Sequence, residues 1–296
     1  VYNSSDSLDE LCETISEVLK HQNIRKEIIL IDDCSVDNSW IKIRDLASVD
    51  SEIKGLKLSK NFGQHNAITA GIDYANGDWA VFMDCDLQDN PNELTKFIPH
   101  TSNSSNIIVG KRTKRKDSLL KVFSSNLFKY FINLLGEIDY DNSSSNYIMC
   151  SRKVLDATKA MKERTRSLPL HLMNLGFNRI HIEIDHNKRK HGKSSYNLHK
   201  LLNLATDCII SNSNKPLIIS IKIGIILSFF SIFFAGYILV KFLSNEILVP
   251  GWTTIIILIS LLSGLGFINM GVLGLYIGKI YNELKGRPIY VIDEYT

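Results

Sequence analysis

Apolar and polar residues alternate in two different rhythms over the first 185 or so residues of the chain. Short apolar runs that read as strands alternate with stretches whose apolar residues recur every three or four positions, as on one face of a helix. The stretch from Ser7 to His21, for example, carries a helical stripe that includes Leu8, Leu11 and Ile15. Strands are predicted at residues 27–31, 54–58, 79–83 and 107–109, and helices at 7–21, from about 38, and at 64–74.

This alternation predicts an α/β domain with a mostly parallel sheet and helices on both faces. In such sheets, ligands bind beyond the carboxyl ends of the strands. Two acidic groups fall at such ends, because Asp32-Asp33 follows one predicted strand and the segment from Asp84 to Asp89 follows another. No GxGxxG motif follows a strand and no GxxxxGK[ST] motif occurs, which argues against a dinucleotide-binding fold and a P-loop.

The pattern changes after residue 215, where two long uncharged stretches appear. Residues 223–240 and 247–278 contain no charged side chain, and each stretch is long enough to cross a hydrocarbon core of about 30 Å. Two helices buried in a soluble core are the alternative, but runs such as Ile255 to Ile259 have no polar face. We therefore predict two transmembrane helices, at about 217–241 and 252–278.

Basic residues flank this hairpin at both ends, whereas its short connection carries one Lys and one Glu. By the positive-inside rule, the N-terminal domain and the C-terminus are expected in the cytoplasm, in a multi-pass protein of the inner (cytoplasmic) membrane. The pair Gly274 and Gly278 has the spacing that lets two helices approach closely. It serves either the packing of the hairpin itself or a homo-oligomer contact.

The segment WAVFMDCDLQDN, residues 79–90, ends an apolar run in three acids within six positions. A polar turn is one interpretation, since Asn90-Pro91 suits a turn. The other is a cation site, because alternate residues of an extended segment point the same way, so that Asp84 and Asp86 converge with Gln88 beyond them. Hard oxygen ligands of this kind suit Mg²⁺ or Mn²⁺. The position at a strand end favours the cation site.

Composition says less about the function than these sequence patterns do. The net charge of +3 does not demand a nucleic-acid partner, and no groove-reading helix or aromatic platform is apparent. The five cysteines are scattered without zinc spacing and read as reduced cytosolic thiols. The chain has no signal peptide and begins inside what reads as a strand end, so that a first strand, expected before Val1, is missing.

Four motifs in order resemble family 2 glycosyltransferases: VYN at 1–3, EIILIDDCSVDNS at 27–39, NFGQHNAITAG at 61–71 and DCDLQDNP at 84–91. They are most similar to the membrane-attached branch that transfers sugars to polyprenyl phosphates, which includes dolichyl-phosphate mannose synthase and its bacterial relatives. The resemblance continues through RKHGKSSYNLHKLLNLATD at 189–207 and GLYIGKIYNELKGRP at 274–288. It therefore covers nearly the whole chain.

The resemblance implies a GT-A type catalytic domain at residues 1–190, a juxtamembrane amphipathic helix within 191–215, the hairpin at 216–278 and a cytoplasmic tail at 279–296. It also implies roles for single residues. The nucleoside of a UDP- or GDP-sugar would contact Tyr2, Asp32, Asp33, Asn61 and Asp84. The metal, Mg²⁺ or Mn²⁺, would contact Asp84, Asp86 and Gln88. The phosphates would contact Arg112 and Arg189.

One position departs from many relatives, which read Gly-Asp-Phe-Arg where this chain has Ser145 to Ile148. Asn146 thus replaces a proposed catalytic base. A phosphate monoester has a second pKa near 6, so a polyprenyl phosphate is largely dianionic at neutral pH and needs no strong base. It needs positive charge, which two basic clusters provide: Lys111, Arg112, Lys114, Arg115, Lys116 and Lys121, and Lys188, Arg189, Lys190, His191 and Lys193.

These features predict an inverting, metal-dependent glycosyltransferase that transfers a sugar from a nucleotide-sugar to undecaprenyl phosphate, for the synthesis or modification of cell-envelope glycans. A glycosyltransferase acting on another membrane glycan is one alternative. The other is a degenerate protein that binds nucleotide-sugar without turnover, an interpretation supported by Asn146 and Ile148.

Overall fold

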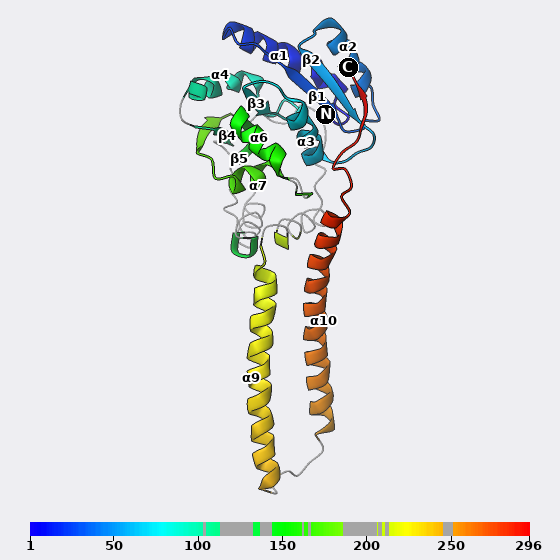
Figure 1. Cartoon of the computed structure of the whole chain (residues 1–296), viewed down its shortest axis with the longest axis vertical. Coiled ribbons are helices and arrows are strands. Elements are labelled where there is room, and N and C mark those ends of the chain that lie inside the picture. The colour runs from blue at the N-terminus through cyan, green and yellow to red at the C-terminus, as the bar shows by residue number, and fades with distance from the viewer. Residues whose placement is uncertain are drawn as a thin grey trace. The chain divides into compact units, whose positions relative to one another are not determined.

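The structure is a computed structural model and divides into two compact units (Figure 1). It describes residues 1–102, 105–112, 133–136, 144–161, 163–164, 167–185, 206, 209–210, 213–244 and 251–296. Unit 1 comprises Val1–Ser125, Asp141–Ser195 and Arg287–Thr296, and unit 2 comprises Asn126–Tyr140 and Tyr196–Gly286. The end of the chain therefore belongs to the same unit as its beginning.

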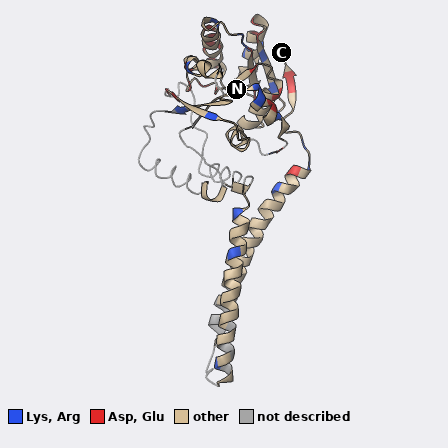
Figure 2. Ribbon diagram, turned by 60° about the vertical axis from the view of Figure 1, so that its left-hand side comes forward, with Lys and Arg blue, Asp and Glu red and all other residues tan. Residues whose placement is uncertain are grey.

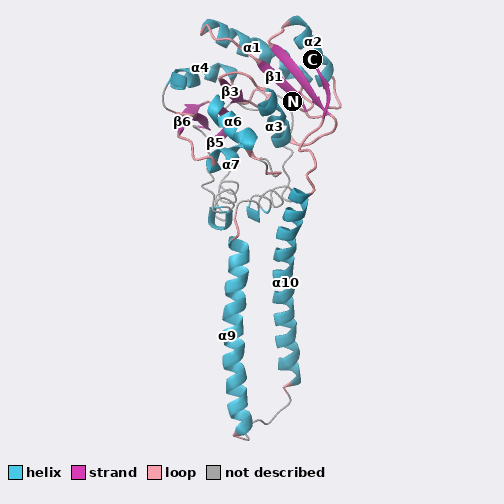
Figure 3. Ribbon diagram, in the orientation of Figure 1, coloured by secondary structure: helices cyan, strands magenta, loops and turns pink. Residues whose placement is uncertain are grey.

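Unit 1 contains two sheets (Figure 3). The first has the order β1-β2-β7, and its strands are β1 (Ile28–Asp32), β2 (Ile53–Leu58) and β7 (Ile292–Tyr295). The second has the order β3-β5-β4-β6, and its strands are β3 (Trp79–Phe82), β4 (Ile107–Arg112), β5 (Ser144–Ser151) and β6 (Arg179–Ile184). The pairs β1–β2 and β4–β6 are parallel, while β2–β7, β3–β5 and β4–β5 are antiparallel. The predicted α/β architecture is confirmed, but the strand directions are mixed rather than mostly parallel, because β5 and β7 run antiparallel to their neighbours.

Helices cover these sheets because each buries one apolar stripe. They are α1 (Leu8–His21), α2 (Ser39–Val49), α3 (Gln64–Tyr74), α4 (Leu94–Phe97), α6 (Arg152–Ala160) and α7 (Leu168–Asn174), with 3₁₀ turns at Ser5–Ser7, Pro91–Glu93 and Ile98–Ser102. In α1, Leu8, Leu11 and Val18 are buried. Acidic residues in its first turn and basic residues in its last turn also suit the helix dipole.

The apolar core lies on both faces of the second sheet and around the first. Strands β4 and β5 pack against α6 and α7 through a cluster that includes Ile107, Ile148 and Leu155. On the other face, Phe97 of α4 contacts Tyr147 with ring centroids 4.9 Å apart. Burial raises the pKa of the Tyr147 phenol well above its usual range, so this side chain stays neutral.

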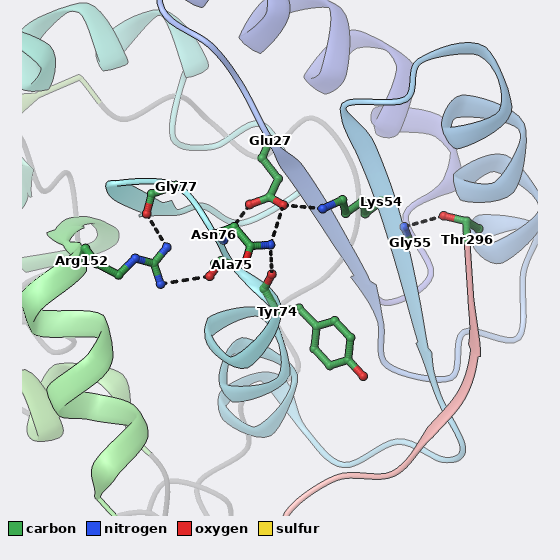
Figure 4. Close-up of polar contacts among 9 residues, drawn as sticks. All are labelled: Glu27, Lys54, Gly55, Tyr74, Ala75, Asn76, Gly77, Arg152 and Thr296. Atoms are coloured by element: carbon green, nitrogen blue, oxygen red, sulfur yellow. Dashed lines mark hydrogen bonds and ion pairs between the residues drawn. The ribbon is translucent and has the colours of Figure 1, made fainter.

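The turn between α3 and β3 is held by two charged side chains, Glu27 just before β1 and Arg152 at the start of α6 (Figure 4). Glu27, beside β1, accepts hydrogen bonds from Lys54 Nζ at 2.6 Å and from the Asn76 backbone N–H at 2.8 Å. From the other side, the Arg152 guanidinium donates to the carbonyl of Ala75 at 3.0 Å and to that of Gly77. Burial acts to raise the pKa of Glu27, but the hydrogen bonds from Lys54 and Asn76 outweigh it and hold the pKa below its usual value.

We expect Arg152→Ala to lower the free energy of unfolding by about 1–3 kcal/mol, because two backbone carbonyls lose a charged donor. Asp156→Asn is the matched control. It removes only the exposed 3.7 Å ion pair to Arg152 and should change stability by less than about 0.5 kcal/mol. Thermal unfolding of both variants, followed by tryptophan fluorescence, checks this, and equal losses in the two variants would contradict it.

Unit 2 contains the two long apolar helices, α9 (Lys215–Leu243) and α10 (Trp252–Leu284). The stretches Lys215–Phe234 and Leu261–Leu284 are long and apolar enough to cross a membrane, and neither is buried inside the protein. In the ribbon of Figure 2, the charged residues of these helices lie toward their ends, and the described residues between them are uncharged. The predicted pair of apolar helices is confirmed.

Polar side chains connect the two helices at one face of α10. Ser220 Oγ donates to Asn269 Oδ1 at 2.6 Å, and the Tyr276 hydroxyl donates to the Ser213 carbonyl at 2.7 Å. Among the described residues, Gly274 and Gly278 do not take part, since a Cβ atom on either would meet none of them within 4 Å. With 3.6 residues per turn, Gly278 lies on the side of α10 opposite Asn269. Packing within the hairpin therefore leaves this glycine pair unused.

Candidate active site

All four strands of the second sheet have one terminus at the same end of the sheet. Arg112, the last residue of β4, pairs with Ile184, the last residue of β6. The antiparallel pairing of β3 with β5 includes Phe82 opposite Ile148. Asp84 follows the end of β3 by two residues, and Asn146 precedes Ile148 by two residues in β5. This end of the sheet therefore collects the acids after β3, the basic end of β4 and the beginning of β5.

The acidic segment after β3 is a tight turn. Asp84 and Asp86 are both half-buried, and Asp86 Oδ1 accepts the backbone N–H of Gln88 at 3.1 Å. Leu87, between Asp86 and Gln88, has a left-handed backbone, with φ of 57°, and its side chain is buried. Asn90 then caps the following 3₁₀ turn by accepting the Asn92 N–H. The turn interpretation is confirmed by the backbone of this segment. The cation site stays a prediction, for which the turn provides two carboxylates.

The acids after β1 are more deeply buried and organise loops. Asp32 is fully buried and accepts the Ser35 N–H with both oxygens at 3.3 Å. Asp33 accepts the N–H groups of Phe62 at 2.7 Å and Gly63 at 2.9 Å, one on each oxygen. Each carboxylate oxygen has a second lone pair, so these loop contacts leave acceptor capacity on both acids.

The first residues of the chain lie against this acid pair. The Val1 amino group donates to the Ile31 carbonyl at 2.6 Å, and the Asp33 N–H donates to the Val1 carbonyl at 2.9 Å. Tyr2 follows with half of its surface exposed. Asn3 accepts the Val36 N–H and so ties this segment to the loop after β1. An exposed aromatic side chain in a segment that is hydrogen-bonded to the strand end with the buried acids suits a nucleoside site.

The two acid groups are connected through the loop that starts α3. The Gln64 side-chain amide donates to Asp84 Oδ1 at 2.7 Å, and the two preceding residues donate to Asp33. Gln64 belongs to the NFGQ motif, but its role could not be predicted, because nothing in the sequence signals a contact between residues 20 positions apart. Gly63, with φ of 90°, supplies the backbone conformation that begins the helix.

Other predicted residues are less well defined. Asn61 and Asn146 are exposed. Arg189, most of the two basic clusters and most of the predicted amphipathic helix lie outside the described residues. The two acid groups, Tyr2 and residues 62–64 therefore make up the candidate site.

The donor set fits a divalent cation shared with a substrate. In the described part of the chain, no three His, Cys, Asp or Glu side chains gather closely enough to hold a metal ion by themselves. Mg²⁺ is commonly bound by one or two carboxylates together with substrate phosphates, so a larger cluster is not required. Asp84, Asp86 and the Gln88 amide would provide the protein ligands, and a diphosphate would provide the rest.

Residues 1–188 match the model of glycosyl transferase family 2, and the chain belongs to this family. Family membership agrees with the GT-A type domain expected from the motifs. The chain is therefore a glycosyltransferase by class, and its curated relatives indicate which kind of glycosyltransferase it is most similar to.

The relatives match over almost the entire length. The chain is 32% identical to an uncharacterized glycosyltransferase, sll0501, of Synechocystis, over 99% of this chain and 93% of that protein. It is 30% identical to the undecaprenyl-phosphate 4-deoxy-4-formamido-L-arabinose transferase of Proteus mirabilis, over 99% and 91%. Among solved structures, it is similar to glucosyl-3-phosphoglycerate synthase from Mycobacterium tuberculosis, with a TM-score of 0.49 and 15% identity over 71% of this chain and 75% of that one.

Proposed function

We propose that this protein is a membrane-bound inverting glycosyltransferase that moves a sugar from a UDP- or GDP-sugar to undecaprenyl phosphate. The observation that carries the proposal is the full-length match to the undecaprenyl-phosphate transferase of Proteus mirabilis, which extends through the apolar hairpin. A catalytic domain alone would need no such hairpin, whereas a polyprenyl acceptor remains in the membrane.

The donor would bind across the two acid groups. The nucleoside would be held by Asp32, Asp33, Asn61 and Tyr2. Asp84 would lie between the nucleoside and the metal. Asp84, Asp86 and Gln88 would hold Mg²⁺ or Mn²⁺ on the donor diphosphate. When bound, such a cation supplies charge stabilisation for the departing diphosphate.

The acceptor would be bound by basic groups. Arg112 ends β4 at the edge where the acids lie, and Arg189 belongs to the second basic cluster. Both would attract the lipid phosphate, whose oxygen attacks the anomeric carbon of the sugar while the diphosphate leaves. Because the phosphate is already ionised at neutral pH, it needs no proton acceptor of its own.

This account predicts little effect of restoring an acid at position 146. We expect Asn146→Asp to change kcat less than about threefold, since a general base contributes only where a proton must be removed. Asn146→Ala, which also lacks a base, is the matched control and should retain activity of the same order. A gain of 10²-fold or more in Asn146→Asp would indicate that the wild-type protein lacks a needed base, and would favour the degenerate protein.

The C-terminal strand supports the proposed localisation. Strand β7 follows α10 and pairs with β2 of unit 1, which supports both flanks of the hairpin lying on one side of the membrane. The hairpin would therefore cross the membrane twice. With basic residues at both flanks, that side would be the cytoplasm, in the inner membrane. The unused Gly274 and Gly278 pair supports a homo-oligomer contact with a second copy of this chain.

A donor panel tests the proposal. The full-length protein in detergent, with undecaprenyl phosphate and Mn²⁺, is offered radiolabelled UDP- and GDP-sugars one at a time. Label that enters the lipid phase supports the proposal and identifies the donor. Label that enters only a membrane glycan would instead favour the alternative acceptor. Donor binding without transfer to either acceptor would favour the degenerate protein.

A further inference from the structure

Gln64 contacts the proposed cation site although nothing in the proposed function uses it. It is the first residue of α3, and its side chain reaches Asp84 at the end of β3, where Nε2 donates to Oδ1 at 2.7 Å. We propose that Gln64 is a positioning residue that fixes the orientation of the Asp84 carboxylate for a divalent cation. This inference rests on the proposed function and adds a residue to its site.

The backbone beside Gln64 is itself held in place. The N–H groups of Phe62 and Gly63 donate to the buried Asp33 carboxylate at 2.7 and 2.9 Å. One turn further along, the Asn66 side-chain amide donates to the Phe62 carbonyl at 2.8 Å. Gln64 therefore starts from a fixed position, and its short contact to Asp84 transmits that position from the first sheet to the second.

The chemistry of an amide suits this task. Asp84 and Asp86 are like charges in one turn, and without a cation they favour orientations that separate them. A donor on Asp84 opposes that movement. A Lys or Arg at this place would form an ion pair that competes with the cation, whereas the neutral amide of Gln64 holds the carboxylate and leaves its charge available. Hydrogen bonds to ligating carboxylates of this kind are a usual part of metal sites.

Position 64 also allows a clean test, because the side chain is exposed and its loss should not affect folding. Gln64→Met keeps the length of the side chain and removes the amide. Thr69→Ala is the matched control. It lies on the same helix, and it removes only the hydrogen bond from Thr69 Oγ1 to the His65 carbonyl at 2.9 Å.

Mn²⁺ binding is measured by electron paramagnetic resonance on the full-length protein in detergent, with UDP and with GDP. Gln64→Met should weaken Mn²⁺ binding about tenfold, at the lower end of the usual effect for outer-shell partners, and Thr69→Ala should leave it unchanged. In the transfer assay, Gln64→Met should need more Mn²⁺ for half-maximal rate but approach the wild-type kcat when Mn²⁺ saturates.

Asp84→Ala separates failure of the inference from failure of the proposed function. If Gln64→Met binds Mn²⁺ like the wild type while Asp84→Ala binds it weakly, Gln64 has no positioning role and the cation site stands. If Asp84→Ala also binds Mn²⁺ like the wild type, the cation site is elsewhere and both ideas are overturned.

Discussion

Replacing Asp86 by asparagine should reduce transfer by about 10³-fold while leaving the fold intact. The size follows from the role proposed for this carboxylate, since loss of one group that stabilises transition-state charge typically costs about 10²–10³-fold. The asparagine side chain is isosteric, and its carbonyl oxygen can still accept the Gln88 N–H that Asp86 accepts in the turn. Only the charge is removed, so the variant should lose transfer activity and keep its stability.

The comparison with Asp86→Ala makes this prediction specific. Alanine removes both the charge and the turn hydrogen bond. The Asp86→Ala protein should therefore lose as much activity as Asp86→Asn, and its free energy of unfolding should also fall by about 1 kcal/mol. Initial rates at saturating donor and acceptor, together with the melting temperature of each variant, provide the measurement. An Asp86→Asn protein that keeps more than a tenth of the wild-type rate would show that the carboxylate does not hold a catalytic cation.

Deleting residues 290–296 should destabilise unit 1 by about 3 kcal/mol or more, because several hydrogen bonds of about 1 kcal/mol each are lost together. Thr296 exchanges two hydrogen bonds with Gly55, its N–H donating at 3.0 Å and its hydroxyl accepting at 2.8 Å. Trp40 Nε1 donates to Glu294 at 3.0 Å, and the Ser59 N–H donates to the Val291 carbonyl at 2.9 Å.

Apolar burial adds to this loss. Tyr290 and Ile292 pack against a core cluster that contains Leu58, Ala67 and Ala70, and the Tyr290 hydroxyl donates to Asp73 at 2.7 Å. Burial, with the neighbouring Asp73 carboxylate, raises the pKa of Tyr290 far above its usual value. Without β7, one edge of β2 would also be exposed to pairing with other chains, so the truncated protein should aggregate more readily.

A single substitution within the same strand controls for charge. Asp293→Asn removes the 3.6 Å ion pair between Asp293 and Lys57, both of which are partly exposed, and should change stability by less than about 0.5 kcal/mol. Melting temperature and resistance to limited proteolysis are compared across wild type, Asp293→Asn and the truncation. A truncated protein as stable as the wild type would mean that β7 is not part of the folded unit in solution.

The site was predictable from sequence where its signals are local. The acids after residues 79–83 stand out because an apolar run ends in polar oxygen ligands at alternate positions, a pattern set within one short segment. Helix α3 also begins and ends where its apolar period predicts, at Gln64–Tyr74. The apolar hairpin follows from length and composition alone.

Features that depend on distant partners were not predictable. Residues 292–295 form a strand because β2 offers a free edge, and no periodicity in four residues could reveal that pairing. Strand β5 lies between β3 and β4 and runs antiparallel to both, whereas the alternating pattern suggested a mostly parallel sheet. The Gln64 contact to Asp84 likewise exists only once two sheets have assembled.

The most direct test of the proposed activity compares two acceptors that differ only in the phosphate. With the donor identified from the panel, the full-length protein is supplied with undecaprenyl phosphate or undecaprenol, each with Mn²⁺ or with EDTA, and label in the lipid phase is counted. We predict label only with undecaprenyl phosphate and Mn²⁺. Equal labelling of undecaprenol, or undiminished labelling in EDTA, would contradict a cation-assisted attack by an ionised lipid phosphate.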